Sequence, residues 1–135
     1  MNPSQPRLAI IENEVHVGRS LCLLLEDMEI KPTHFLSSRD AVTHLLAHPE
    51  AYDAVLLDFF HGPEDLQGWE ILDLLLDSIP QMPLMVMSGH ADFPRQKIEK
   101  MQLPVEVPVF EKPLTTADME QVAERSRLRT SHPVT

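Results

Sequence analysis

Short apolar runs alternate along the chain with longer segments in which apolar residues recur every three or four positions. The runs cover residues 8–11, 54–57, 84–87 and 107–110. Runs of about four to eight apolar residues are typical of strands buried on both faces, whereas helical spacing is typical of amphipathic helices. The alternation therefore predicts an α/β fold in which helices cover both faces of a parallel sheet.

Helices are predicted near residues 14–28, 38–48, 69–79, 93–101 and from 116 onward, and a weaker strand near 32–36. Two of these helices follow sequences typical of a capping box, Ser37 to Asp40 and Thr115 to Asp118. The last strand is predicted at an edge of the sheet, because Pro108 lies in it and proline has no amide hydrogen to donate. We expect one domain over residues 7–128, with flexible termini at residues 1–6 and 129–135.

Polar side chains stand where the four apolar runs end. Glu12 and Asn13 follow the first run, Asp58 the second and Ser88 the third, and Lys112 lies just beyond the fourth. The carboxyl ends of parallel strands line one crevice, so these groups are expected to converge. Carboxylates, a hydroxyl and an ammonium at one site indicate phosphoryl transfer, because they can bind a metal ion and the oxygens of a phosphoryl group.

The order of these residues resembles that of the receiver domains of two-component response regulators. In that family an acidic pair follows the first strand, an Asp the third, a Ser or Thr the fourth and Lys-Pro the fifth. The resemblance extends here from about Arg7 to about Arg127. It implies a flavodoxin-like, doubly wound, five-stranded parallel sheet with (βα)5 connectivity. It also implies a self-phosphorylating phosphoacceptor rather than a turnover enzyme.

The resemblance implies that Asp58 accepts a phosphoryl group from the phosphohistidine of a histidine kinase or a phosphotransfer protein. Ser88 and Lys112 would contact the phosphoryl oxygens, the first by a hydrogen bond and the second as a point charge. The resemblance also implies a cis bond between Lys112 and Pro113, which proline makes accessible. A change in a protein-interaction surface would then carry the signal to a downstream protein.

A magnesium ion is the cofactor that the resemblance implies. Its ligands would be Glu12, Asn13, Asp58 and the backbone carbonyl of Phe60, in an oxygen shell of the kind that Mg²⁺ requires. Asn13 departs from the family, which usually places an Asp there, and an amide oxygen brings no charge to the ion. We therefore expect weak Mg²⁺ binding. Asn13 has a second interpretation as the N-cap of the first helix, a position that Asn favours.

Two other functions are considered for the same fold. A pseudo-receiver would act as a phosphorylation-independent interaction module, and it is suggested by Asn13 and by Val109, which stands where the family often has a switching aromatic residue. A phosphatase of the haloacid-dehalogenase kind would need a second Asp two residues after Asp58, but Phe60 occupies that position.

His61, three residues after Asp58 in the sequence, is interpreted as an exposed loop residue.

The charge of the chain favours protein partners over nucleic acid. The 135 residues include 11 basic and 21 acidic side chains and carry a formal net charge of −10, whereas phosphate binding needs clustered Lys and Arg. No apolar run approaches the roughly 18 residues that span a bilayer, and we expect a cytoplasmic protein without a membrane partner. No output module follows residue 129, so we expect a stand-alone receiver or one cut from a longer protein.

The fourth helix, the fifth strand and the last helix are the surface expected to receive the signal. Ser88 and Lys112 end the two strands nearest to it, so a phosphoryl group would be felt there first. Weakly held elements are those that move, and the fourth helix has the weakest pattern. A homodimer could form through an apolar patch on this face made by Phe93, Ile98, Met101 and Val109.

Overall fold

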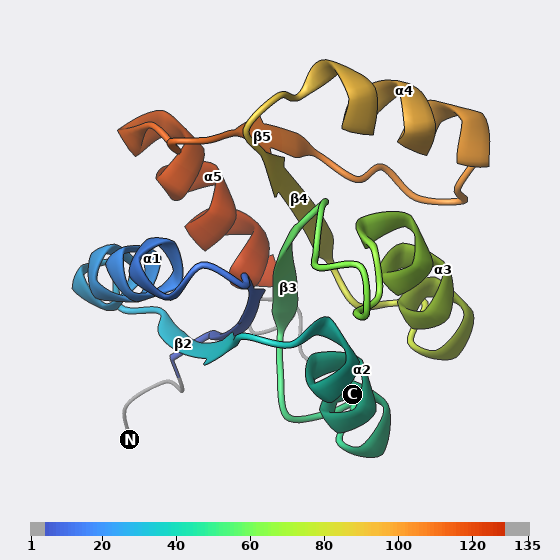
Figure 1. The fold of residues 1–135 in the computed structure, drawn as a ribbon. Coiled ribbons are helices and arrows are strands. Elements are labelled where there is room, and N and C mark those ends of the chain that lie inside the picture. The colour runs from blue at the N-terminus through green and yellow to red at the C-terminus, as the bar shows by residue number, and fades with distance from the viewer. Residues whose placement is uncertain (1–4, 129–135) are drawn as a thin grey trace.

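The computed structural model describes residues 5–128. Of the ends predicted to be flexible, at residues 1–6 and 129–135, residues 1–4 and 129–135 lie outside the described residues, whereas Pro6 is buried and its carbonyl oxygen accepts from the Lys31 amide at 2.8 Å. Strands and helices alternate strictly along the chain (Figure 1). The strands are β1 (Arg7–Ile11), β2 (Lys31–Phe35), β3 (Ala54–Asp58), β4 (Leu84–Ser88) and β5 (Val109–Glu111). The helices are α1 (Val15–Asp27), α2 (Ser38–Ala47), α3 (Gly68–Ser78), α4 (Asp92–Met101) and α5 (Thr116–Ser126).

The five strands form one parallel sheet in the order β2-β1-β3-β4-β5. The chain first winds outward from β1 to β2 and then returns past β1 to β3, so the order reverses at the β1–β3 boundary. This is the flavodoxin-like, doubly wound arrangement predicted from the sequence, with β5 at an edge as expected. Its switch point, where such sheets bind ligands, lies between the carboxyl ends of β1 and β3.

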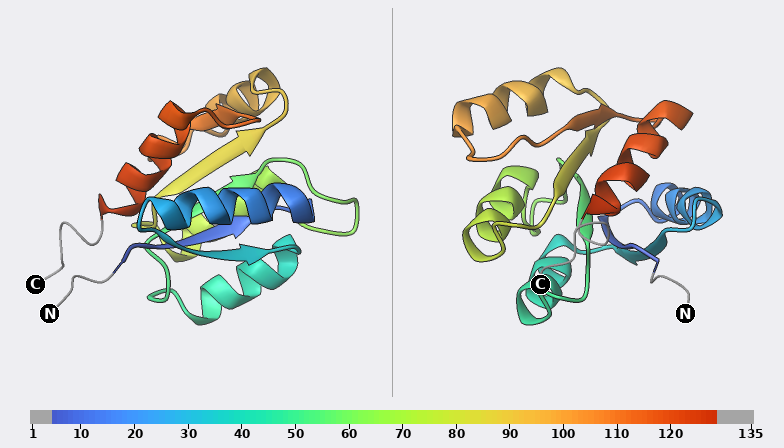
Figure 2. Two further views of the ribbon diagram at one scale, coloured as in Figure 1. Left: turned by 90° about the vertical axis from the view of Figure 1, so that its left-hand side faces the viewer. Right: turned by 180° about the vertical axis from the view of Figure 1, so that it is seen from behind.

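Helices cover both faces of the sheet: α1 and α5 lie on one face, and α2 and α3 lie on the other (Figures 1 and 2). Successive residues of a strand point to opposite faces. In β1, Leu8 and Ile10 accordingly pack with the α1 and α5 side chains, whereas Ala9 and Ile11 pack with those of α2 and α3. Among residues 5–128 no helix has the length and apolar character needed to cross a membrane.

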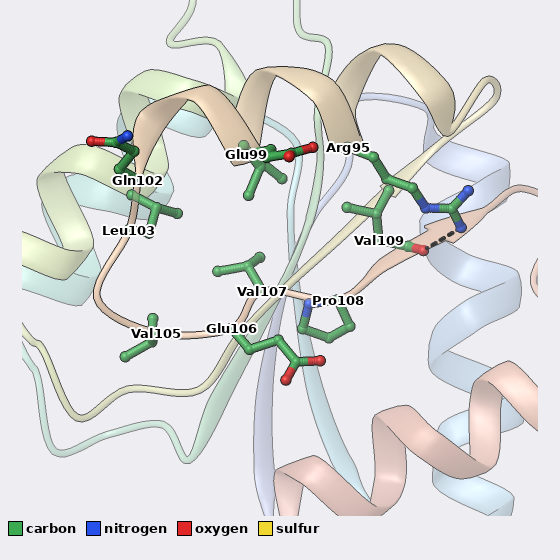
Figure 3. A pocket seen from close by; sticks show the side chains of 10 residues that line it. Arg95, Glu99, Gln102, Leu103, Val105, Glu106, Val107, Pro108 and Val109 are labelled. Carbon is green, nitrogen blue, oxygen red and sulfur yellow. Dashed lines mark hydrogen bonds between the residues drawn. The ribbon is translucent and has the colours of Figure 1, made fainter.

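Helix α4 stands beside β5 at the edge of the sheet, over a pocket formed with the connecting segment at residues 102–108 (Figure 3). Arg95 Nη2 donates a hydrogen bond to the Val109 carbonyl oxygen at 3.1 Å and ties the helix to the strand. The predicted strand began at residue 107, but β5 begins at Val109. Pro108 explains the difference, because it cannot donate to the ladder and only its carbonyl takes part, accepting from the Val86 amide at 2.9 Å.

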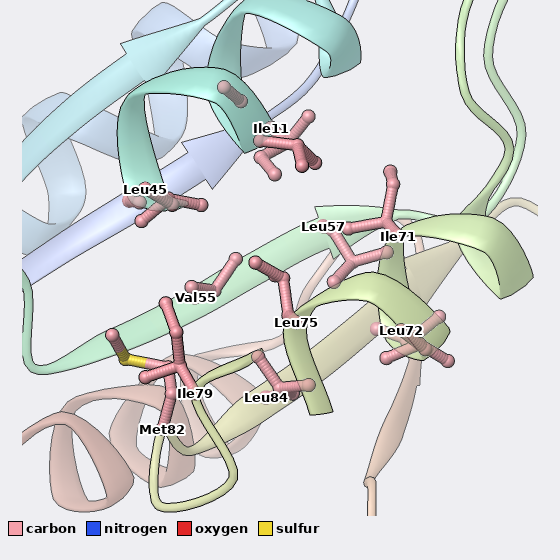
Figure 4. Close-up of a cluster of buried hydrophobic side chains, with 14 of the residues drawn as sticks. Ile11, Leu45, Val55, Leu57, Ile71, Leu72, Leu75, Ile79, Met82 and Leu84 are labelled. Carbon is pink, nitrogen blue, oxygen red and sulfur yellow. The ribbon is translucent and has the colours of Figure 1, made fainter. Parts of the chain in front are cut away.

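The larger core cluster lies between α2, α3 and the sheet (Figure 4). Ile71, Leu72 and Leu75 of α3 are fully buried in it. Helix α3 begins with a reciprocal capping box between Gln67 and Glu70, which the sequence analysis missed because Gln is not a favoured cap. The predicted Thr115 box is present, whereas at the start of α2 only half of the predicted box forms, with the Ser37 side chain accepting from the Asp40 amide.

Adjacent leucines of α3 offer a test of this packing. Leu75 is 0% exposed and Leu74 is 40% exposed. Leu75→Ala should lower the free energy of unfolding by about 2 to 5 kcal/mol, because it removes buried methyl groups and leaves a cavity. Leu74→Ala, with the same change in size and helix propensity, should lower it by well under half as much. Urea denaturation of the two variants measures the difference, and equal losses would contradict the arrangement of α3.

Candidate functional site

The ammonium of Lys112 lies between two buried carboxylates at the switch point of the sheet. Its Nζ is 2.8 Å from Glu12 Oε1 and 3.0 Å from Asp58 Oδ2. Glu12 is 0% exposed and directly follows β1, and Asp58, 7% exposed, is the last residue of the neighbouring β3. The structure thus brings together three of the candidate residues from positions up to 100 residues apart.

Burial dominates the electrostatics of this triad. Desolvation raises the pKa of Asp58, the charge of Glu12 raises it further, and Lys112 opposes both without reversing them. Burial by itself lowers the pKa of Lys112, but hydrogen bonds to Glu12 and Asp58 raise it above its ordinary value. Both shifts are upward because one ammonium serves two carboxylates. Lys112 is therefore held as a cation, while the ionised form of Asp58 remains costly.

Ser88 lies at the end of β4, and its carbonyl oxygen accepts a hydrogen bond from the Lys112 amide at 2.8 Å, but its hydroxyl is engaged elsewhere. Its hydroxyl donates to the His90 carbonyl oxygen at 3.0 Å and accepts from the His90 amide at 3.3 Å. The side chain is 1% exposed. The hydroxyl is thus engaged in the turn that follows its own strand, and it would have to rotate away from this turn to reach a phosphoryl group on Asp58.

Asn13 is exposed, and it does not cap the first helix. The N-cap residue of α1 is Glu14, so the capping interpretation of Asn13 is wrong. The Glu14 amide instead donates to Glu12 Oε2 at 3.1 Å. The side chain of Glu12 therefore satisfies a free backbone amide at the start of α1, which is the role that the capping interpretation gave to Asn13.

Phe60 follows the site on the loop between β3 and α3. The residue is 45% exposed, and its ring stacks on that of Phe93 of α4, with ring centroids 5.8 Å apart. The Phe60 amide lies 3.5 Å from Asp58 Oδ1. The role expected for the Phe60 carbonyl, as a metal ligand, stays a prediction.

The carboxylates fit a hard divalent cation in the type of donor that they offer. Glu12 and Asp58 supply charged oxygens at one end of the sheet, as Mg²⁺ prefers. In the part of the chain that the structure describes, however, no group of three His, Cys, Asp or Glu side chains is placed to hold a metal ion. Lys112 already supplies positive charge to both carboxylates. A cation bound here would therefore share them with an ammonium.

Asp65 anchors the β3–α3 loop to the start of α2. Its carboxylate accepts hydrogen bonds from the backbone amides of Ser38 at 2.7 Å, Arg39 at 2.8 Å and Leu66 at 3.1 Å. Partial burial raises the pKa of Asp65, but these hydrogen bonds outweigh it and lower the pKa to about 2. Sequence patterns did not reveal this contact, because the partners are up to 27 residues apart.

His61 is 8% exposed, so its interpretation as an exposed loop residue is wrong. Its ring Nε2 lies 2.6 Å from the carbonyl oxygen of Asp58. The loop folds inward here because Gln67 holds it: the His61 amide donates to Gln67 Oε1, and Gln67 Nε2 donates to the His61 carbonyl, both at 3.0 Å. A buried histidine beside the candidate acceptor was therefore missed by the sequence analysis.

The contact made by Asp65 should give the domain an acid-sensitive component of stability. Because the pKa of Asp65 is lowered from 3.8 to about 2 in the folded state, its contribution is complete above pH about 4 and disappears as the pH falls through about 2. Asp65→Ala should therefore lower stability by about 1 to 2 kcal/mol at neutral pH, as loss of a helix cap does, and by less at pH about 3. The exposed neighbour Glu64 provides the control, as Glu64→Ala. Urea titrations across pH test this, and a pH-independent difference would contradict it.

Comparison with protein-family models and with curated proteins gives no match. Solved structures do match. A response regulator receiver domain protein from Clostridium thermocellum aligns with a TM-score of 0.78 and 21% identity over 93% of this chain and 97% of that one.

A response regulator receiver protein from Sinorhizobium medicae aligns with a TM-score of 0.77 and 22% identity, over 95% of this chain and 99% of that one. The beryllofluoride-activated NtrC4 receiver domain dimer aligns with a TM-score of 0.72 and 17% identity, over 92% and 98%. Since these structures cover almost the whole of both chains, the protein has the fold of response-regulator receiver domains.

Proposed function

We propose that this protein is a phosphorelay receiver in which Asp58 accepts a phosphoryl group from the phosphohistidine of a histidine kinase or phosphotransfer protein. The observation that carries the proposal is the contact of Lys112 Nζ with both Glu12 and Asp58 at the switch point of a receiver fold. The ammonium that contacts the Asp58 carboxylate can pair with a phosphoryl oxygen once the carboxylate carries a phosphoryl group, and the carboxyl ends of parallel strands are where such sheets bind ligands.

The transfer step uses the ionised carboxylate of Asp58. One of its oxygens attacks phosphorus while the bond from phosphorus to the donor nitrogen breaks, and the bonding electron pair leaves with the donor imidazole. Lys112 neutralises charge on the phosphoryl oxygens, and Ser88 donates a hydrogen bond to one of them after leaving the His90 carbonyl. Bound Mg²⁺ would supply further positive charge at the attacked group, held by Glu12, Asp58, Asn13 and the Phe60 carbonyl.

A pseudo-receiver that binds a partner without phosphorylation is the second candidate. It is favoured by one observation. Asn13 is neutral and exposed, so it adds no negative charge to that of Glu12 and Asp58, and Lys112 balances much of the charge on these two carboxylates that would otherwise attract a cation. In that case the triad would be a structural ion pair. The phosphorylation assay below separates the two candidates.

The partners that fit this proposal are a histidine kinase or phosphotransfer protein, a downstream protein and a second copy of the chain, with no nucleic acid or membrane, in the cytoplasm. For the dimer, the surface of α4, β5 and α5 is proposed, and a structure of similar fold is a receiver dimer. Ile98, Met101 and Val109 pack partly against the core. Phe93 of α4, and Val105 on the segment before β5, are exposed large apolar side chains available to a second copy.

The phosphoacceptor is tested by mass. Incubation with acetyl phosphate and millimolar Mg²⁺ should add one phosphoryl group to the wild-type chain, and Asp58→Asn should abolish the addition because the amide is not a nucleophile. Asp77→Asn, an exposed substitution on α3 with the same change in charge, should be phosphorylated like the wild type. An unchanged mass of the wild-type chain would reject the receiver and support the pseudo-receiver.

Asn13→Asp tests whether residue 13 binds the metal. A charged oxygen in place of the amide should tighten Mg²⁺ binding about tenfold, because a close opposite charge at a partly exposed site contributes about 1 kcal/mol or more. Calorimetric titration with MgCl2 measures the effect. Gln81→Glu adds the same charge before β4, at the opposite end of the sheet, and should leave the affinity unchanged. Equal affinity in Asn13→Asp and the wild type would remove residue 13 from the metal site.

A further inference from the structure

Two histidines outside the triad donate to the backbone carbonyls of its two acids. His34 Nε2 lies 2.7 Å from the Glu12 carbonyl oxygen, and His61 Nε2 lies 2.6 Å from that of Asp58. A carbonyl oxygen only accepts, so Nε2 carries the hydrogen in both rings. The two contacts come from different elements, β2 and the β3–α3 loop, and they meet the ends of the adjacent strands β1 and β3.

These contacts lie just beyond the place where pairing between the two strands stops. The last pair of the β1–β3 ladder is Ile11 with Leu57, so Glu12 and Asp58 each extend one residue past it. The hydrogen bonds between β1 and β3 that hold the preceding residues in place have ended at this point. A buried carbonyl needs a hydrogen-bond donor, and the two imidazoles supply it. We propose that His34 and His61 are positioning residues, which hold the Glu12 and Asp58 carboxylates in place through the backbone carbonyls of those residues.

The place of His34 is built into the packing of α1. A Cβ added to Gly18 would overlap with Cε1 and Nε2 of the His34 ring. Any other residue at position 18 would therefore displace the ring from the Glu12 carbonyl. The Glu12 amide donates to the Phe35 carbonyl at 3.0 Å, so β2 holds both the amide and the carbonyl of the first acid.

The buried position of His61 lowers the stability of the fold in a way that packing alone does not require. Its Nδ1 is buried and has no hydrogen-bond partner within the described part of the chain. An unsatisfied buried nitrogen lowers stability, and an apolar side chain of similar size would avoid the loss. The ring is kept in this place by the two hydrogen bonds between the His61 backbone and Gln67. Among the described residues, the one hydrogen-bond partner of the ring itself is the Asp58 carbonyl oxygen, which Nε2 contacts.

A fixed backbone at Glu12 and Asp58 limits the positions that their carboxylates can take. Lys112 meets both carboxylates at 3.0 Å or less, and phosphoryl transfer requires an oxygen of Asp58 in line with the breaking bond. A displacement of about 1 Å can cost about 100-fold in rate. This part of the inference rests on the proposed receiver function, but the positioning itself is a property of the unphosphorylated domain.

Replacement of each histidine by two amides tests the inference. Gln carries its NH2 group at about the reach of Nε2, whereas Asn is one methylene shorter and does not reach the carbonyl. His34→Asn and His61→Asn should each reduce the rate of phosphorylation by acetyl phosphate about tenfold or more, and the corresponding Gln variants should stay within about threefold of the wild type. His48→Asn, at an exposed position on α2's C-cap, should leave the rate unchanged.

A second measurement needs neither metal nor phosphate. The Glu14 amide donates to Glu12 Oε2, so its hydrogen exchange reports on the position of that carboxylate. Exchange should accelerate at least about fivefold in His34→Asn and in Gly18→Ala, which displaces the ring, but not in His34→Gln. If the wild-type chain is not phosphorylated and this exchange pattern is still seen, the receiver function fails and the positioning role stands.

The inference is overturned if the Asn and Gln variants behave alike, at position 34 in both measurements and at position 61 in the rate of phosphorylation. Equal rates close to the wild type would mean that the contacts do not position the acids. Equal losses with equal falls in melting temperature would mean that the imidazoles act only through packing.

Discussion

Two carboxylates are buried side by side in this protein, and the ammonium of Lys112 is what makes this possible. Glu12 is fully buried and Asp58 nearly so. An unpaired carboxylate in such surroundings would be strongly disfavoured, and two of them would repel each other as well. Lys112 contacts both, so the carboxyl edge of the sheet depends on one side chain delivered by the strand β5 at the edge.

The rest of the structure can be understood as the means of bringing these three groups together. The parallel sheet places the carboxyl ends of β1, β3 and β5 side by side at one end of the sheet. The loops that follow these strands must then leave no buried polar group without a hydrogen-bond partner. Asp65 binds the β3–α3 loop to α2, and Gln67 binds it to α3. The candidate acceptor is therefore preceded by a rigid strand and followed by an anchored loop.

The charge of the triad also connects the structure to its proposed chemistry. The pKa of Asp58 is raised because burial and Glu12 outweigh Lys112. In the proposed function, an added cation would stabilise the ionised Asp58, and conversion to an acyl phosphate would place the charge of the phosphoryl oxygens near Lys112. Asn13 is neutral and adds no negative charge beside Asp58, whereas a third carboxylate would disfavour the ionised form further.

Local sequence determined the elements of this protein and the residues at their ends. Apolar runs and helical spacing act over a few residues, so they predicted the strands, the helices, the parallel sheet and the strand-end positions of Glu12, Asp58, Ser88 and Lys112. They could not determine contacts between distant segments. Whether Asn13 caps α1, whether His61 is buried and what Asp65 binds were decided by tertiary packing, because each depends on how a loop crosses the sheet. The same holds for the bond from His34 to Glu12, which exists only because a glycine in α1 leaves room for the ring.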